Sequence, residues 1–271
     1  MSPASPDRGQ ALAARLLPQA EALAQAEPLL GPFLRRLAGP TPSLAGWLAR
    51  LLGTRLADAD ISAARLAKLF LSQYHLHPQL LPLAAGDVAA ALRRDPASRD
   101  ELDVVLHQKG FQAVLLQRLA HTLWQEGREA LARQLQSAAA RVFGVDIHPA
   151  CRLGRELMLD HATGIVIGQT ASVGDGVSIM QGVTLGGTGK HGGDRHPKIG
   201  AGVLIGASAV LLGNIRIGAQ ARIGAGSVVL RDVPAGATAV GVPARIIPGP
   251  PPACPPSEDM EHNRREMEVS A

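Results

Sequence analysis

Residues 199–229 read IGAGVLIGASAVLLGNIRIGAQARIGAGSVV, and an aliphatic side chain returns at every sixth position of this stretch. The repeating positions are Ile199, Ile205, Leu211, Ile217, Ile223 and Val229. A six-residue unit is long enough for one short strand and a turn, but it cannot bury its apolar face alone. Stacked copies bury a continuous column of aliphatic side chains, so the period predicts a parallel β-helix.

The same period extends toward the N-terminus in two further registers, separated by a slip of two residues. The first register contains Ile147, Leu153, Leu159 and Ile165, and the second contains Ile167, Val173, Ile179 and Leu185. The positions four residues after each aliphatic residue mostly carry small side chains, as expected if these side chains also pack inside a narrow coil. They hold Val203, Ala209, Ile215, Ala221 and Ser227. We therefore place a β-helix domain at residues 143–247, with its end near Val233-Pro234 and the segment 241–245.

Residues 1–142 differ in composition, because they are dense in Ala, Leu, Arg, Gln and Glu, which favour helices. Between Phe111 and Val142 apolar residues recur at steps of three and four, which predicts one long amphipathic helix or two. The fold class is therefore α + β, an all-helical domain followed by the β-helix. Residues 248–271 are Pro-rich and charged, with too little apolar surface to offset the entropy of ordering, so we expect a disordered tail.

The composition of the whole chain excludes several classes of protein. The formal net charge is only +4 and the basic residues are scattered, which argues against a nucleic-acid partner. Two cysteines, Cys151 and Cys254, are too few for a disulfide framework, so a reducing cytoplasm is expected. No apolar block follows residues 1–10, and we expect neither a signal peptide nor a membrane span.

The repeat is interrupted between Leu185 and Ile199, which lie fourteen positions apart, two more than a pair of hexapeptides. The interruption reads GGTGKHGGDRHPK, so it concentrates His, Arg, Lys and Asp among glycines that allow close approach of the backbone. Interruptions of a solenoid are common on its binding face, so this loop is a candidate wall of an active site. It lacks the strand, helix and Lys-Ser/Thr of a P-loop, which excludes nucleoside triphosphate binding.

A second polar cluster, Leu159-Asp160-His161-Ala162-Thr163-Gly164, places a carboxylate and an imidazole where a coil normally carries small residues. Histidine with an ordinary pKa near roughly 6.5 accepts a proton from an alcohol near neutral pH, for which a carboxylate alone is too weak a base. His161 is therefore a candidate general base.

Several motifs together resemble one family. They are Val145-Asp146-Ile147-His148-Pro149, the cluster 159–164, the segment 183–190 and Gly192 through Ile199, with Arg94-Asp95-Pro96-Ala97, Lys109-Gly110-Phe111 and Gly241 through Arg245 outside them. These motifs, spread over residues 60–247, are similar to bacterial serine acetyltransferases of the hexapeptide-repeat transferases. The resemblance implies a left-handed β-helix after a helical domain, a homotrimer or a dimer of trimers, and acetyl transfer from acetyl-CoA to the hydroxyl of L-serine, the first step of cysteine biosynthesis from serine.

The resemblance also implies roles for single residues. His161 is the general base and Asp146 orients it, so the hydroxyl attacks the thioester directly, without an acyl-enzyme. Serine is bound by Asp95, Asp160, Arg195 and His196, with His196 near the reacting end and counted with the catalytic residues. Acetyl-CoA, a co-substrate and not a resident cofactor, is expected along Gly187, Thr188, Gly206, Ala207, Ser208 and Ala225. No metal is expected, and His148, which precedes Pro149, is assigned a structural role.

The sequence departs from the family pattern in two places. Gln169 stands in Ile167-Gly168-Gln169-Thr170 where the enteric relatives carry a glutamate, which removes a charge near the site. Family tails that dock into cysteine synthase end in isoleucine, whereas this chain ends Val269-Ser270-Ala271. A complex with cysteine synthase through the tail therefore stays open.

Three alternatives remain at the level of the sequence. Another hexapeptide O-acyltransferase could use one histidine base on homoserine or a sugar, although Asp95, Asp160 and Arg195 favour an amino acid. A trimeric β-helix of the γ-carbonic-anhydrase type could hold zinc through His161, His191 and His196. A catalytically silent scaffold is the third, and the presence of His161 and His196 together with aspartates speaks against it.

Overall fold

The computed structural model describes residues 7–40, 42–189, 192–249 and 252–260. The chain divides into two compact units, one ending at Gly144 and the other beginning at Val145. The last helix of the first unit ends at Phe143, and Gly144 caps it in the left-handed conformation with φ 68°. The change of composition at residue 143 therefore coincides with the end of the helical structure.

The first unit is helical throughout its described residues. Its helices are α1 (Asp7–Ala26), α2 (Gly31–Ala38), α3 (Leu44–Leu56), α4 (Ala63–Leu76), α5 (Leu80–Arg94), α6 (Glu101–His107), α7 (Lys109–Gln125) and α8 (Glu129–Phe143). The pattern over 111–142 thus forms two helices, and Gly127, with φ 77°, lies in the turn between them. Helices α5 and α7 are joined in the interior by an ion pair between Asp87 and Arg118, both of which are buried.

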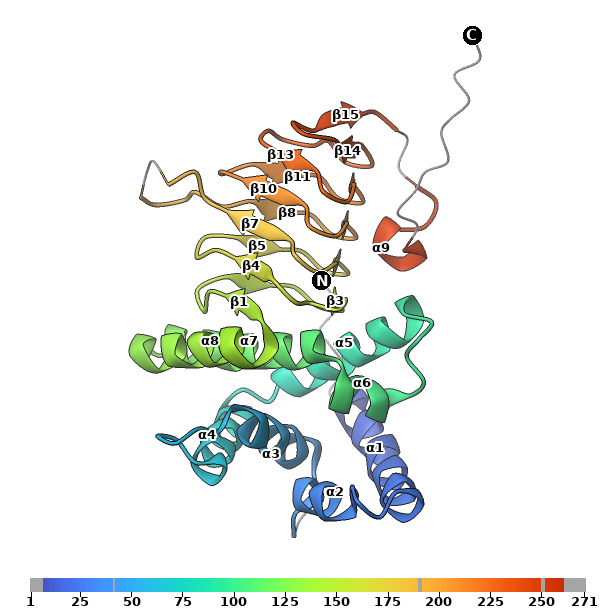
Figure 1. The fold of residues 1–271 in the computed structure, drawn as a ribbon, viewed down its shortest axis with the longest axis vertical. Helices are drawn as coiled ribbons and strands as arrows, with labels where there is room; N and C mark the ends of the chain where they lie inside the picture. Colours follow the sequence, from blue (N-terminus) through green and yellow to red (C-terminus); the bar gives the residue numbers. More distant parts are fainter. Residues whose placement is uncertain (1–6, 41, 190–191, 250–251, 261–271) are drawn as a thin grey trace. The chain divides into compact units, whose positions relative to one another are not determined.

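The second unit is a parallel β-helix of three sheets, seen in Figure 1 as a stack of coils. The first sheet contains β1 (Val145–Ile147), β4 (Ile165–Ile167), β7 (Thr184–Gly186), β10 (Val210–Leu212) and β13 (Val228–Val229). The second contains β2 (Arg152–Leu153), β5 (Ser172–Val173), β8 (Lys198–Ile199) and β11 (Arg216–Ile217). The third contains β3 (Met158–Leu159), β6 (Ser178–Ile179), β9 (Leu204–Ile205), β12 (Arg222–Ile223), β14 (Thr238–Val240) and β15 (Arg245–Ile247).

The strand register confirms the hexapeptide interpretation. Leu185 pairs with Leu211, and Leu211 pairs with Val229, so aliphatic positions of successive coils lie on top of one another. The aliphatic column is buried, apart from the partly exposed Leu153 near its N-terminal end. The positions four residues after each aliphatic residue are buried as well, from Val203 to Ser227. The predicted fold, a helical region followed by a parallel β-helix of hexapeptide repeats, is confirmed.

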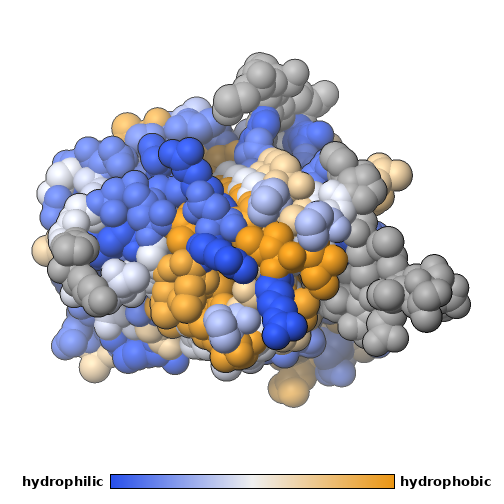
Figure 2. Space-filling view, turned by 90° about the horizontal axis from the view of Figure 1, so that it is seen from above, coloured by the Kyte–Doolittle hydropathy of each residue, from blue (hydrophilic) through white to orange (hydrophobic). Residues whose placement is uncertain are grey.

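The β-helix ends with a reversal of strand direction. Strand β14 still pairs in parallel with β12, but β15 returns antiparallel to β14 and stops the stacking. The end leaves Val240, Val242 and Ile247 exposed. Figure 2, which views the molecule from above relative to Figure 1, shows hydrophobic residues gathered on this face among strongly hydrophilic ones.

The structure corrects the expectation of disorder for one part of the tail. Residues 252–260 are ordered and include the short helix α9 (Pro256–Asp259). The Asp259 carboxylate pairs with Arg222 of β12 at 2.7 Å, and the Ser178 hydroxyl donates to the Ser257 carbonyl at 3.0 Å. A mostly buried guanidinium needs an anionic partner, and the prolines of the segment reduce the entropy of ordering it. Residues 250–251 and 261–271 lie outside the described residues.

Both cysteines are free in the structure. Cys151 is buried, and burial raises the pKa of its thiol to about 12, whereas Cys254 is exposed. Cys151 is therefore a small residue packed in the interior. Over the described ranges, no helix combines the length and the apolar composition needed to cross a membrane.

Candidate functional site

The first part of the candidate site is the corner between β3 and β4, which carries His161. Eight positions separate Leu159 from Ile167, whereas six separate the paired positions Ile179 and Leu185 of the next coil. The longer corner is accommodated by left-handed backbone at His161 (φ 54°) and Ala162 (φ 58°), a conformation that non-glycine residues adopt rarely. The two-residue slip of the sequence is therefore the local distortion that presents His161.

The distorted corner lifts the imidazole of His161 away from the coil. Its side chain is 71% exposed, and Nε2 lies 3.7 Å from Oδ2 of Asp160, whose side chain is 21% exposed. Asp146 lies on β1 at a half-buried position between the buried Val145 and Ile147, and it pairs with Val166 of β4. The carboxylate that lies near the imidazole in the structure is thus that of Asp160. The orientation of His161 by Asp146 remains a prediction.

The second part is the loop between β7 and β8. Leu185 and Ile199 lie in successive sheets, and their partners in the next coil are Leu211 and Ile217. Those partners are six positions apart, whereas Leu185 and Ile199 are fourteen positions apart. The insertion is therefore eight residues long, and the expected excess of two over a pair of hexapeptides was wrong. The sequence spacing alone could not show how many sheets the loop passes. Residues 190 and 191 within it lie outside the described residues.

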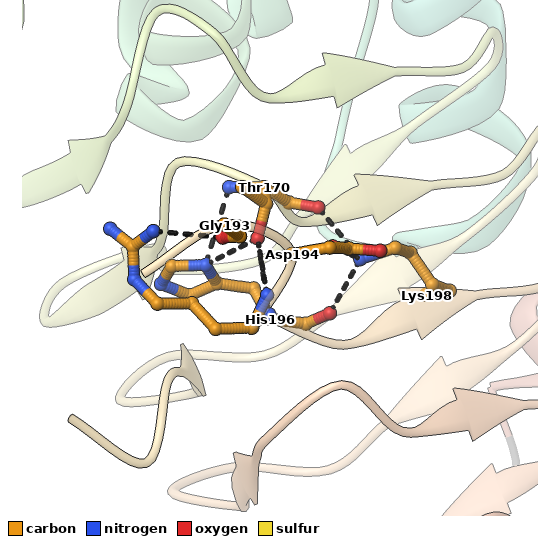
Figure 3. A network of polar contacts seen from close by, with 6 residues as sticks. Thr170, Gly193, Asp194, His196 and Lys198 are labelled. Carbon is orange, nitrogen blue, oxygen red and sulfur yellow. Dashed lines mark hydrogen bonds and ion pairs between the residues drawn. The ribbon is translucent and has the colours of Figure 1, made fainter. Parts of the chain in front are cut away.

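His196 in this loop is buried, with 7% of its surface exposed, and Thr170 holds it (Figure 3). The backbone N–H of Thr170 donates to Nδ1 of His196 at 3.2 Å, and Thr170 Oγ1 lies 2.7 Å from the same nitrogen. Oγ1 also accepts from the backbone N–H groups of Arg195 at 3.0 Å and His196 at 3.1 Å. Thr170 thus ties the inserted loop to the turn that follows β4.

Space for the His196 ring comes from Gly168. A Cβ atom at position 168 would lie 2.0 Å from Nε2 and from Cδ2 of His196, so no side chain fits there. Burial lowers the pKa of His196 below its ordinary value, and the charges of Arg195 and Lys198 act in the same direction, whereas Asp194 opposes them. His196 is therefore held in the neutral form near neutral pH.

The charged residues beside His196 are held by the loop itself. Arg195 Nη1 donates to the Gly193 carbonyl at 3.0 Å, and Nη2 donates to Gln169 Oε1 at 3.1 Å. Lys198 Nζ donates to Asp194 Oδ1 at 2.5 Å and to the Thr170 carbonyl at 2.8 Å. In this structure the amide of Gln169 therefore holds the Arg195 guanidinium without neutralising its charge.

Asp95 belongs to the helical unit, where it follows α5. Its Oδ1 accepts from the Ala97 N–H at 2.8 Å, and its Oδ2 accepts from Ser98 Oγ at 2.9 Å and from Gln108 Nε2 at 3.0 Å. These bonds fit the turn that an Asp-Pro pair starts. Its role as a substrate ligand remains a prediction.

The stacking of the coils explains why some of the residues assigned to acetyl-CoA are small. A Cβ atom at Gly206 would lie 2.7 Å from the backbone nitrogen of Ala225, so the next coil requires glycine there. Ser208 adopts left-handed backbone with φ 59°, and at Gly187 a Cβ atom would lie 3.3 Å from Arg195. The smallness of Gly206 is therefore not by itself a sign of a ligand, and the acetyl-CoA positions remain predictions.

Thr170 and Gly168, which flank Gln169, carry no sequence signal of a functional role. The bonds of Thr170 join residues 26 positions apart, and no local pattern reports them. Among the described residues, no group of three His, Cys, Asp or Glu side chains is placed to hold a metal ion. His191, one of the three histidines of the zinc alternative, lies outside those residues. His148 accepts from the Ala150 N–H at 3.1 Å through Nδ1, and its structural role remains a prediction.

A β-helix that carries an exposed histidine on a distorted corner and a cationic inserted loop defines a hexapeptide-repeat transferase. Residues 196–231 match the family of bacterial transferase hexapeptides, and residues 13–116 match the N-terminal family of serine acetyltransferases. The chain belongs to the serine acetyltransferase family.

Individual relatives support this assignment. A probable serine acetyltransferase 1 of Oryza sativa subsp. japonica is 50% identical over 88% of this chain and 79% of its own length. The serine acetyltransferase of Salmonella typhimurium is 48% identical over 90% of this chain and 89% of its own length. The structure of soybean serine acetyltransferase complexed with serine has 47% identity and a TM-score of 0.86, covering 90% of this chain and 100% of the soybean chain.

Proposed function

We propose that this protein is an acyltransferase that moves the acetyl group of acetyl-CoA to the hydroxyl of L-serine, giving O-acetyl-L-serine and CoA. The observation that carries the proposal is the exposed His161 on its distorted corner, in a chain of the serine acetyltransferase family. An exposed imidazole can reach a bound substrate, and imidazole is the side chain that most often acts as a general base. The soybean relative complexed with serine supports the same acceptor.

The reaction we propose is a direct transfer in a ternary complex. His161 takes the proton of the serine hydroxyl while the oxygen attacks the thioester carbonyl carbon. The tetrahedral oxyanion then collapses, the carbon–sulfur bond breaks, and the CoA thiolate leaves with the proton that His161 held. Serine and acetyl-CoA are the two reactants, and O-acetyl-L-serine and CoA account for all their atoms without an acyl-enzyme.

Charge matching assigns the remaining roles within the proposal. Arg195 binds the serine carboxylate, and Asp160 and Asp95 bind its ammonium group. Asp146 orients His161, and His196 lies at the reacting end. Acetyl-CoA runs along the predicted positions Gly187, Thr188, Gly206, Ala207, Ser208 and Ala225.

The family also supports a cytoplasmic enzyme that assembles as a homotrimer or as a dimer of trimers. Cysteine synthase is a candidate partner of this assembly. Size-exclusion chromatography with light scattering, alone and with cysteine synthase added, measures both assemblies.

The decisive experiment measures thiol release from acetyl-CoA by metal-free protein with L-serine, L-homoserine or a simple galactoside as acceptor. Release that depends on serine supports the proposal. Release with another acceptor and not with serine would keep the fold and overturn the substrate. Activity that returns only after zinc is added would favour the metalloprotein alternative, and no release with any acceptor would favour a silent scaffold.

A further inference from the structure

We propose that Thr170 is a positioning residue that fixes His196 as a neutral imidazole with its proton on Nε2. His196 then donates a hydrogen bond to an oxygen of the bound amino acid or of the reacting carbonyl, and it does not serve as a second base. This inference deepens the proposed function and rests on it for the identity of the substrate.

The Thr170 hydroxyl has a limited hydrogen-bonding capacity. A threonine oxygen has two acceptor lone pairs and one proton to donate. Both lone pairs are used by the backbone N–H groups of Arg195 and His196, at 3.0 and 3.1 Å. The hydroxyl also lies 2.7 Å from His196 Nδ1, and it forms a hydrogen bond with the Asp194 carboxylate, which can only accept. Because both lone pairs of Oγ1 are used, Oγ1 cannot accept from a proton on Nδ1, so Nδ1 is the unprotonated nitrogen of the ring.

The backbone N–H of Thr170 leads to the same assignment without the hydroxyl. The backbone N–H of Thr170 also points at Nδ1, with the nitrogens 3.2 Å apart, and an amide N–H can only donate. A proton on Nδ1 would face this N–H directly. The N–H donor at Nδ1 therefore places the single proton of the neutral ring on Nε2.

The charges around the ring act in the same direction. Arg195 and Lys198 both disfavour the imidazolium. Asp194, the one acidic neighbour that opposes them, is paired with Lys198 at 2.5 Å. Gly168 and Gln169, in the turn after β4, add no charge. The geometry and the neighbouring charges thus agree on a neutral ring.

The ligand contact that we assign to His196 is its Nε2 atom. Within the described part of the chain, none of the hydrogen bonds of the ring involves Nε2, and the two that hold it both meet at Nδ1. Gly168 leaves room for the ring edge that carries Nε2, because a Cβ atom there would lie 2.0 Å from Nε2. An Nε2–H donor next to the Arg195 guanidinium suits an oxygen acceptor that carries or develops negative charge.

The test reads the protonation state directly. The full-length protein is labelled with ¹⁵N-histidine, and His196→Gln assigns its resonances in long-range ¹H–¹⁵N spectra recorded from pH 5 to 8. We expect Nδ1 of His196 to stay in the unprotonated range and Nε2 to carry the proton throughout neutral pH. A proton on Nδ1, or an imidazolium at pH 7, would overturn the inference.

Two variants then test Thr170. In Thr170→Val the hydroxyl is lost with the side-chain shape retained, so His196 should titrate at higher pH, and kcat/KM for serine should fall by roughly 10- to 100-fold, the loss of one well-placed interaction. Thr170→Ser keeps the hydroxyl and should restore both properties. Equal titration of His196 in all three proteins would refute the role of Thr170. The titration needs no turnover, so a failure of the proposed function is recognised separately by the acceptor assay.

Discussion

The two histidines of the candidate site occupy opposite environments. His161 stands on a corner of left-handed backbone with 71% of its side chain exposed, and its nearest ionic neighbour is 3.7 Å away. His196 is 7% exposed, and Thr170 binds one of its ring nitrogens. One type of side chain can therefore serve two tasks, because an exposed imidazole can reach a reacting group directly, whereas burial beside cations favours the neutral form.

The largest loss of activity is expected for a change of the exposed histidine, His161. His161→Ala removes the proposed base, so kcat should fall by on the order of 10² to 10⁴ while circular dichroism shows an intact fold. His148→Ala is the matched control, because His148 is a histidine of the same unit to which we assign a structural role, and its Nδ1 accepts from the Ala150 N–H. A kcat within twofold of the parent would remove His161 from the mechanism.

A side chain at position 168 should displace the buried His196 ring and lower the activity. In Gly168→Ala the added methyl group would lie 2.0 Å from the His196 ring, so the ring must move. Displacing an active-site group by about 1 Å costs on the order of 10²-fold in rate, and we expect kcat/KM to fall by that amount. Gly192→Ala on the same loop meets no atom within 4 Å and should behave like the parent. If both variants keep full activity, His196 does not touch the substrate.

A smaller effect is expected at the partner of Arg195. Gln169→Glu would place a carboxylate where an amide now accepts from Nη2 at 3.1 Å. The new carboxylate would compete with the substrate carboxylate, so KM for serine should rise by about two- to fivefold, the strength of an exposed ion pair. The rise should shrink when salt is added. A KM that is unchanged at low salt would show that Arg195 does not bind the carboxylate.

The smallest effect is a pH dependence of stability. The pKa of His196 is lowered by burial first and then by Arg195 and Lys198, so the folded protein binds fewer protons than the unfolded chain between the folded pKa and about 6.5. The free energy of unfolding therefore rises with pH through this window, and the stability is lost as the pH falls. Urea titrations from pH 7 to pH 5 should show a steeper loss for the parent than for His196→Gln. Parallel losses would contradict the assignment.

The sequence located the repeat and both histidines, but it misjudged the features that depend on pairing between distant segments. The aliphatic period from Ile199 to Val229 is local, so it predicted the stacked strands correctly. The length of the insertion before His196 was misjudged, because the sheet reached by the next strand is set by pairing across coils. The order of residues 252–260 was missed because the partner of Asp259, Arg222, lies 37 positions earlier.

The sequence by itself determined the coil, the division near residue 143 and the residue types able to carry acetyl transfer, because six-residue periodicity and side-chain chemistry are local properties. Only the tertiary structure decided that His161 is exposed and that His196 is buried and bound by Thr170. The physical reason is that burial and hydrogen-bond partners depend on neighbours brought together by folding, as Thr170 and His196 are across 26 positions.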